Sequence, residues 1–171
     1  RALPARVVTF GMSEDADVRA IAVDDDGVRG SRISVDCFGH KFEVSMSVPG
    51  RAGTMNALAT IAAATVLGVS SDLVIDGLEA TGAVPGRGAV KRLDNGASLI
   101  DDSYNASPAS VMASIEVLAK APSPRIAVLG DMLELGDQSE QFHSEVGKAT
   151  DLASIDQVIA VGPAAKSIAD A

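Results

Sequence analysis

The chain is poor in aromatic residues and cysteine, and each shortage excludes a class of protein. It has no tryptophan, one tyrosine and four phenylalanines, so stacking platforms for bases are scarce and the core must be largely aliphatic. Cys37 is the single cysteine, which excludes an intrachain disulfide, and the two histidines lack the spacing of zinc ligands. We therefore expect a cytoplasmic protein with Cys37 packed in its core and no metal site in this chain.

Basic residues and long apolar runs are also few. Lysine and arginine together number 14 against 23 aspartates and glutamates, giving a net charge of -9, and no basic cluster is longer than Lys91-Arg92. This balance argues against binding to nucleic acid. No apolar run approaches the roughly 18 residues of a spanning helix, so we expect no membrane insertion. The whole chain has 47% hydrophobic and 22% charged residues, a composition typical of a globular protein.

The first half of the chain predicts strands followed by helices. Apolar or alternating runs predict strands at 6–10, 18–23, 33–38 and 42–48, the last two as an antiparallel pair around a turn at 39–40. Helices are expected at 55–67 and 71–81. Glycine and proline then concentrate between residues 82 and 88, which is typical of a linker. We place a domain boundary there, with one domain at 1–83 and the other at 84–171.

The second half alternates strands and helices. Strands are expected at 97–101, 125–129 and 157–161, and helices at 108–120 and 138–152. This βαβαβ order predicts an α/β fold with a Rossmann-like parallel sheet. Ser107 is a suitable N-cap for the helix that begins at Pro108. Because only three strands are present and the chain ends at Ala171, we expect it to be a fragment of a longer protein.

Two apolar runs in this half end in acidic residues and a turn. Residues 100–108 contain Asp101 and Asp102, and residues 125–136 contain Asp131 and Glu134. Ligands bind at the carboxyl edge of parallel strands, so we expect both runs to contribute to one site. Neighbouring residues of a strand face opposite sides, which favours Asp102 over Asp101 as the site residue. Such a carboxylate can bind ribose hydroxyls or simply cap the following turn, and the spacing leaves both interpretations open.

Other polar residues add to this site. Tyr104 offers a stacking face and Asn105 an amide able to pair with a base edge. Arg87, flanked by two glycines, is a candidate phosphate ligand or else a solvated loop arginine. The chain has no glycine-rich phosphate loop. His143 lacks an identifiable nucleophile or orienting carboxylate, so we expect a partly exposed helix residue without a catalytic role.

Three strings of the second half are similar to a known family: Asp101-Asp102-Ser103-Tyr104-Asn105-Ala106-Ser107-Pro108, Gly130-Asp131-Met132-Leu133-Glu134-Leu135-Gly136 and His143-Ser144-Glu145-Val146-Gly147. They closely resemble the Mur ligase family. Residues 49–67 and the hinge Pro85-Gly86-Arg87 also resemble it. Within the family, the similarity is to the branch that adds D-alanyl-D-alanine to UDP-N-acetylmuramoyl-tripeptide in peptidoglycan precursor synthesis. The resemblance implies the end of a P-loop-type central ATP-binding domain at 1–83 and the start of a Rossmann-like C-terminal domain at 84–171.

The resemblance also implies roles for individual residues. Asn56 would contact adenine, Arg87 the terminal phosphate and Asp102 the ribose, with Tyr104 and Asn105 beside the nucleotide. Asp131 and Glu134 would lie near the dipeptide substrate. ATP and Mg²⁺ are the implied cofactors, with the metal ligands outside this chain, and the full-length enzyme would be a cytoplasmic monomer that proceeds through an acyl phosphate.

One feature of this chain departs from the family pattern, and one motif of the pattern is missing from this chain. Ala52-Gly53 stands where the family usually has His-Asn, and the Gly-Lys-Thr phosphate loop lies outside the region that matches. We therefore expect the isolated chain to be inactive as a ligase. A non-catalytic Mur-like binding module is the alternative. A dinucleotide-dependent oxidoreductase is disfavoured because the required Gly-x-Gly-x-x-Gly after a strand is missing.

Overall fold

A computed structural model describes residues 6–82 and 84–171. These residues divide after Gly82 into two compact units, each with its own core. The units are considered separately below.

The first unit contains a four-stranded sheet in the order β1-β2-β3-β4. Its strands are β1 (Phe10–Gly11), β2 (Val18–Asp25), β3 (Ser31–Cys37) and β4 (His40–Met46). The predicted antiparallel pair is confirmed, since β3 and β4 pair from Ser31↔Met46 to Cys37↔His40. The turn lies at Phe38 and Gly39, one residue earlier than predicted, because His40 already pairs within β4. The strand expected at 6–10 is shorter than predicted, because only Phe10 and Gly11 form a ladder, parallel to β2.

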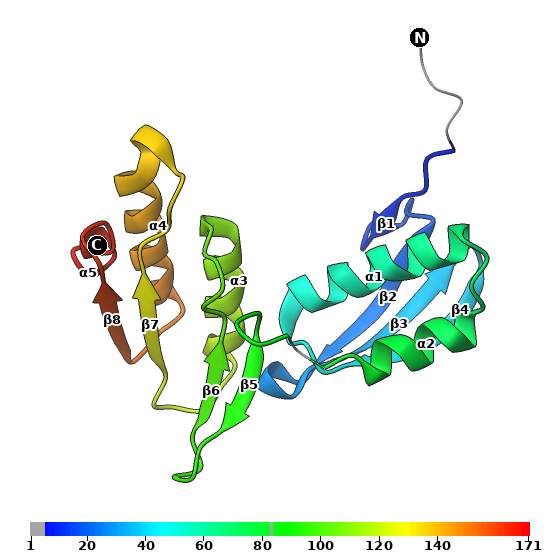
Figure 1. Ribbon diagram of the computed structural model, residues 1–171, viewed down its shortest axis with the longest axis horizontal. Helices are drawn as coiled ribbons and strands as arrows, with labels where there is room; N and C mark the ends of the chain where they lie inside the picture. Colours follow the sequence, from blue (N-terminus) through cyan, green and yellow to red (C-terminus); the bar gives the residue numbers. More distant parts are fainter. Residues whose placement is uncertain (1–5, 83) are drawn as a thin grey trace. The chain divides into compact units, whose positions relative to one another are not determined.

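Two helices of the first unit pack against this sheet, α1 (Gly50–Val66) on β1 to β3 and α2 (Ser71–Ala80) on β4 (Figure 1). A short 3-10 helix, η1 (Gly27–Arg29), joins β2 to β3. Alternate residues of β3, namely Ile33, Val35 and Cys37, are buried with Leu58 and Ile61 of α1. The period of two in the strand and the apolar side of the helix therefore meet in one aliphatic core, as the sequence predicts for Cys37.

The second unit opens with a hairpin that the sequence analysis did not predict. β5 (Ala89–Arg92) pairs antiparallel with β6 (Ser98–Asp101). The expectation that residues 97–101 pair within the parallel sheet is therefore wrong for the described residues, where β6 has β5 as its ladder partner. The turn explains the pairing, because the amide of Leu93 donates to the carbonyl of Ala97 at 2.9 Å and closes the hairpin.

The rest of the second unit is the expected alternation of helices and parallel strands. The remaining elements are α3 (Pro108–Ala119), β7 (Ile126–Gly130), η2 (Gly136–Gln138), α4 (Ser139–Leu152), β8 (Gln157–Val161) and α5 (Lys166–Ala169). β7 and β8 pair in parallel, with α4 between them in sequence (Figure 1). The α/β class and the presence of a parallel sheet with helices are thus confirmed.

The parallel pair β7–β8 is buried on one face and exposed on the other. Leu129, Val158 and Ala160 pack against a core that includes Ile115, Val146 and Ile168. On the opposite face Val128 is 65% exposed and Val161 is 55% exposed. Among the residues that the structure describes, no helix is long and apolar enough to cross a membrane.

Candidate functional site

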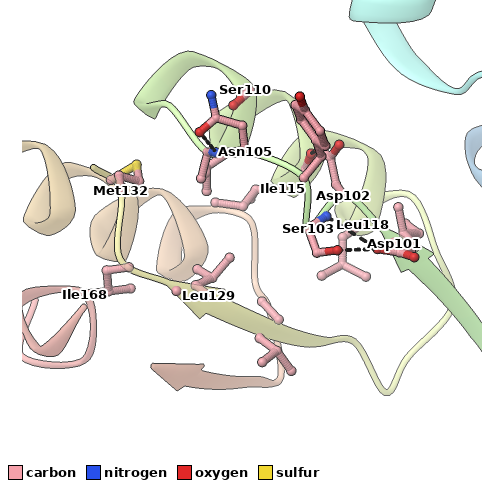
Figure 2. A pocket seen from close by; sticks show the side chains of 18 of the residues that line it. Asp101, Asp102, Ser103, Asn105, Ser110, Ile115, Leu118, Leu129, Met132 and Ile168 are labelled. Atoms are coloured by element: carbon pink, nitrogen blue, oxygen red, sulfur yellow. Dashed lines mark hydrogen bonds between the residues drawn. The ribbon is translucent and has the colours of Figure 1, made fainter. Parts of the chain in front are cut away.

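A pocket of about 640 Å³ in the second unit brings the two acidic runs together. Its lining comes from β6 and the residues that follow it, from one side of α3, from β7 with the start of its following loop, and from Ile168 of α5 (Figure 2). Asp102, Tyr104, Asn105 and Asp131 all line it. The sequence argument that both strand ends contribute to one site thus agrees with the pocket lining. Glu134 and Arg87 are not among the lining residues.

The two neighbouring aspartates have different partners. Asp101 accepts hydrogen bonds from the Lys91 ammonium at 2.9 Å and from the Ser103 hydroxyl at 2.7 Å. The hydrogen bond from Lys91, followed by the one from Ser103, lowers the pKa of Asp101 from 3.8 to about 2. Asp102 instead accepts a hydrogen bond from the Ser114 hydroxyl of α3 at 2.6 Å. Asp101 is therefore tied into the hairpin by a charged partner, whereas Asp102 is exposed and accepts from a neutral hydroxyl.

Arg87 lies over the ring of Tyr104. Its guanidinium carbon is 4.1 Å from the ring centroid, a cation–π contact. The backbone reinforces this arrangement, because the Tyr104 amide donates to the carbonyl of Gly86 at 3.0 Å. Gly86 has a φ of 77°, and a Cβ there would lie 3.2 Å from the Cβ of Tyr104, so glycine is favoured for both reasons. No carboxylate of the described chain lies within ion-pair distance of Arg87 in the structure, which leaves its hydrogen-bond donors available to an anion.

Asn105 and Ser107 shape the turn between β6 and α3. The side-chain oxygen of Asn105 accepts from the amide of Ala106 at 2.9 Å, and its side chain is shown beside Ser110 in Figure 2. Ser107 caps α3 as predicted, accepting from the amide of Ser110, whose own hydroxyl accepts from the Ser107 amide. This closed cap fixes where the helix begins and, with it, the path of the loop that carries Tyr104 and Asn105.

Asp131 and Glu134 lie in the loop after β7 but differ in environment. One carboxylate oxygen of Asp131 accepts from the amide of Ala165 at 2.7 Å, and Gly162 packs so closely that an added Cβ would lie about 2.5 Å from the carboxylate. Asp131 therefore binds the loop after β8, and only part of its hydrogen-bonding capacity is left for a ligand. Glu134 is exposed and has a φ of 62°, a region that non-glycine residues rarely adopt.

His143 is buried, so the expectation of a partly exposed residue is wrong. Its side chain is 0% exposed and forms part of the inner side of α4 with Val146 and Thr150. Its Nε2 accepts a hydrogen bond from the amide of Met132 at 2.9 Å. The position three residues before Val146 is on the same helix face, and that spacing was the available signal for its burial. The sequence offered no sign of the partner in the loop.

Asn56 lies in the first unit, on an exposed position of α1. Near Asn56, the glycine at position 53, which departs from the family pattern, has a structural reason. Gly53 is buried, and a Cβ at this position would lie 2.4 Å from the carbonyl oxygen of Val48. An asparagine in place of Gly53 would therefore require the chain between β4 and α1 to move.

The fold and the pocket define an α/β protein that carries carboxylates, a tyrosine and an arginine around the ends of its strands, an arrangement suited to a nucleotide or another anionic ligand. A comparison with known families agrees with this arrangement. The family described as "Mur ligase, glutamate ligase domain" matches residues 86–171. The chain belongs to the Mur ligase family.

Two individual relatives show which members of the family this chain is similar to. The UDP-N-acetylmuramoyl-tripeptide--D-alanyl-D-alanine ligase of Escherichia coli is 42% identical over 129 residues, which are 75% of this chain and 28% of that protein. The ligase of the same name from Bacillus subtilis is 37% identical over 71% of this chain and 27% of the relative. The chain thus spans less than a third of the length of these two relatives.

Solved structures agree. MurF from Acinetobacter baumannii superimposes with a TM-score of 0.87 at 29% identity, covering 95% of this chain and 35% of that one. MurF ligase from Thermotoga maritima, solved in complex with ADP, gives a TM-score of 0.82 at 31% identity over 94% of this chain and 37% of that structure. Both units are therefore included in the likeness.

Proposed function

We propose that residues 1–171 are part of an ATP-dependent ligase that joins D-alanyl-D-alanine to UDP-N-acetylmuramoyl-tripeptide through an acyl phosphate. The observation that carries the proposal is the group formed by Arg87, Tyr104 and Asp102 beside the pocket, in a chain whose similar relatives are named for this reaction. We assign residues 1–83 to the end of the central ATP-binding domain and 84–171 to the start of the C-terminal domain.

The residues of the second unit fit a nucleotide. The guanidinium of Arg87 presents donors in a planar fork that suits a phosphate, and the ring of Tyr104 below it limits the orientations it can adopt. The carboxylate of Asp102, oriented by Ser114, can accept hydrogen bonds from ribose hydroxyls. Asn105 lines the same pocket as Asp102 and Tyr104. In the first unit, Asn56 is the proposed contact of adenine.

A transferring phosphoryl group needs cations to stabilise its charge, and Arg87 supplies one. ATP is the proposed cofactor together with Mg²⁺, whose charge would stabilise the phosphates when bound. Among the described residues no group of three or more histidine, cysteine, aspartate or glutamate side chains could hold a metal ion. The ligands of the metal are proposed to lie outside this chain.

The dipeptide substrate is proposed to bind near the loop after β7. Glu134 is the exposed carboxylate of that loop, and a carboxylate is complementary to the ammonium group of an amino acid or dipeptide. Asp131 contributes by fixing the loop to the segment after β8, and its second oxygen remains for a ligand.

The test is an assay of the complete polypeptide that contains these residues. Inorganic phosphate released from ATP is measured with UDP-N-acetylmuramoyl-tripeptide alone, with D-alanyl-D-alanine alone and with both. We expect release that depends on both substrates and a ligated product of the corresponding mass. Nucleotide binding without turnover under all three conditions would instead support a non-catalytic binding module.

A further inference from the structure

The imidazole of His143 has its protonation state fixed by two backbone groups. Nδ1 lies 2.7 Å from the carbonyl oxygen of Ser139, one turn earlier in α4, and Nε2 lies 2.9 Å from the amide nitrogen of Met132. A carbonyl oxygen can only accept and a backbone amide can only donate, so Nδ1 carries the ring proton and Nε2 is bare. These contacts therefore require a neutral imidazole in the Nδ1-protonated tautomer.

The amide that His143 binds belongs to a loop that is anchored at its ends and exposed in the middle. The Met132 side chain is 2% exposed and lies in the core of the second unit, against which Leu135 also packs. Between them, Glu134 is exposed with a φ of 62°. Such a backbone conformation persists only where the surrounding contacts enforce it. The hydrogen bond from the Met132 amide to His143 lies two residues before Glu134 in this loop.

We propose that His143 is a positioning residue for the incoming amine substrate. By accepting from the Met132 amide, it holds the loop so that the Glu134 carboxylate is presented at the carboxyl end of β7. This inference rests on the proposed function, because it takes the amine to be the ligand of Glu134. His143 itself is fully buried and does not touch the substrate.

The first part of the test uses NMR on the chain of residues 1–171. The ¹⁵N shifts of the His143 ring are expected to show a proton on Nδ1 and none on Nε2 at neutral pH. In His143→Phe, which keeps a ring but removes the acceptor, the Met132 amide should exchange at least about ten-fold faster. The amides of Ala127 and Leu129 in β7 should change by less than about two-fold.

The second part measures steady-state kinetics of the complete ligase. His143→Phe is expected to raise KM for D-alanyl-D-alanine by about ten-fold while KM for ATP changes less than about two-fold. His143→Gln, whose carbonyl can occupy the place of Nε2, should recover most of the loss. Val146→Ala is the matched control, because it removes packing from the same buried face of α4 and should lower stability without raising this KM.

A double variant separates positioning from general weakening. If His143 acts through Glu134, the combination of His143→Phe with Glu134→Gln should raise KM for the amine no more than the more severe single change. Fully multiplicative effects would overturn the proposal, as would an Nε2-protonated or charged ring, or an unchanged KM in His143→Phe. Should the wild-type enzyme ligate no amine at all, the proposed function fails, whereas the NMR data still decide whether His143 fixes the loop.

Discussion

At the level of single side chains, the structure separates two aspartates that the sequence presents as neighbours. Asp101 is held by Lys91 and Ser103, which lower its pKa to about 2. Because folding lowers this pKa from 3.8, the ionised carboxylate stabilises the folded state fully above pH 3.8, and this stabilisation is lost as the pH falls through about 2.

Replacing Lys91 by methionine should raise the Asp101 pKa toward 3.8, as measured by ¹³C NMR of its carboxyl carbon. Lys148→Met, on an exposed position of α4, is the control and should leave the titration unchanged.

Arg87 is the side chain for which the proposal expects a large effect on turnover and a small one on stability. Its guanidinium is exposed and contacts Tyr104, so Arg87→Ala should cost only about 1 kcal/mol of folding free energy. Loss of a phosphate-binding cation should lower kcat of the complete enzyme by about 100-fold or more. Arg92→Ala, an exposed arginine of β5, is the matched control. Unchanged activity in Arg87→Ala would show that this arginine is not a phosphate ligand.

Among helices and strands, local rules succeeded where a short range of sequence determines the outcome. The cap of α3 formed as predicted because serine and proline act within one helical turn. Replacing Ser107 by alanine should therefore destabilise the second unit by about 1 kcal/mol in chemical denaturation. Ser144→Ala, within α4, should have a much smaller effect, since that position caps no helix terminus. A loss as large in Ser144→Ala would mean that the cap is not the cause.

Pairing between strands was harder to predict, because it depends on contacts that periodicity does not encode. β5 was missed since its four residues are only partly buried or exposed and give no clear alternation, and β6 was consequently assigned the wrong neighbour. His143 was misjudged for a related reason. Its burial depends on a loop eleven residues earlier, whereas the pattern within α4 reports only which side of the helix it occupies. The acidic strand ends, by contrast, were recognised because each is a local pattern of apolar run and turn.

The observed pairing also predicts which amides of the parallel sheet are protected. The Gln157 amide donates to the carbonyl of Arg125, so with the register of β7 and β8 the amides of Ala127 and Leu129 point toward β8 and those of Ile126 and Val128 point away. Hydrogen exchange should be at least about ten-fold slower for the first pair than for the second. Equal protection of all four amides would indicate that β7 has a second strand neighbour.

Considered across both units, the chain carries the residues that we propose for nucleotide binding but no glycine-rich loop to hold the phosphates through backbone amides. Arg87 and Asp102 can contribute contacts, yet in-line phosphoryl transfer also requires the phosphates to be cradled and their charge to be stabilised by a metal. We therefore expect the polypeptide of residues 1–171 to bind ATP weakly and to release no phosphate in response to the two substrates. Isothermal titration with ATP, a phosphate assay and the complete ligase as positive control check both statements. Substrate-dependent phosphate release from residues 1–171 alone would mean that the phosphate-binding elements lie within this chain and that the roles proposed for its two units must be reassigned.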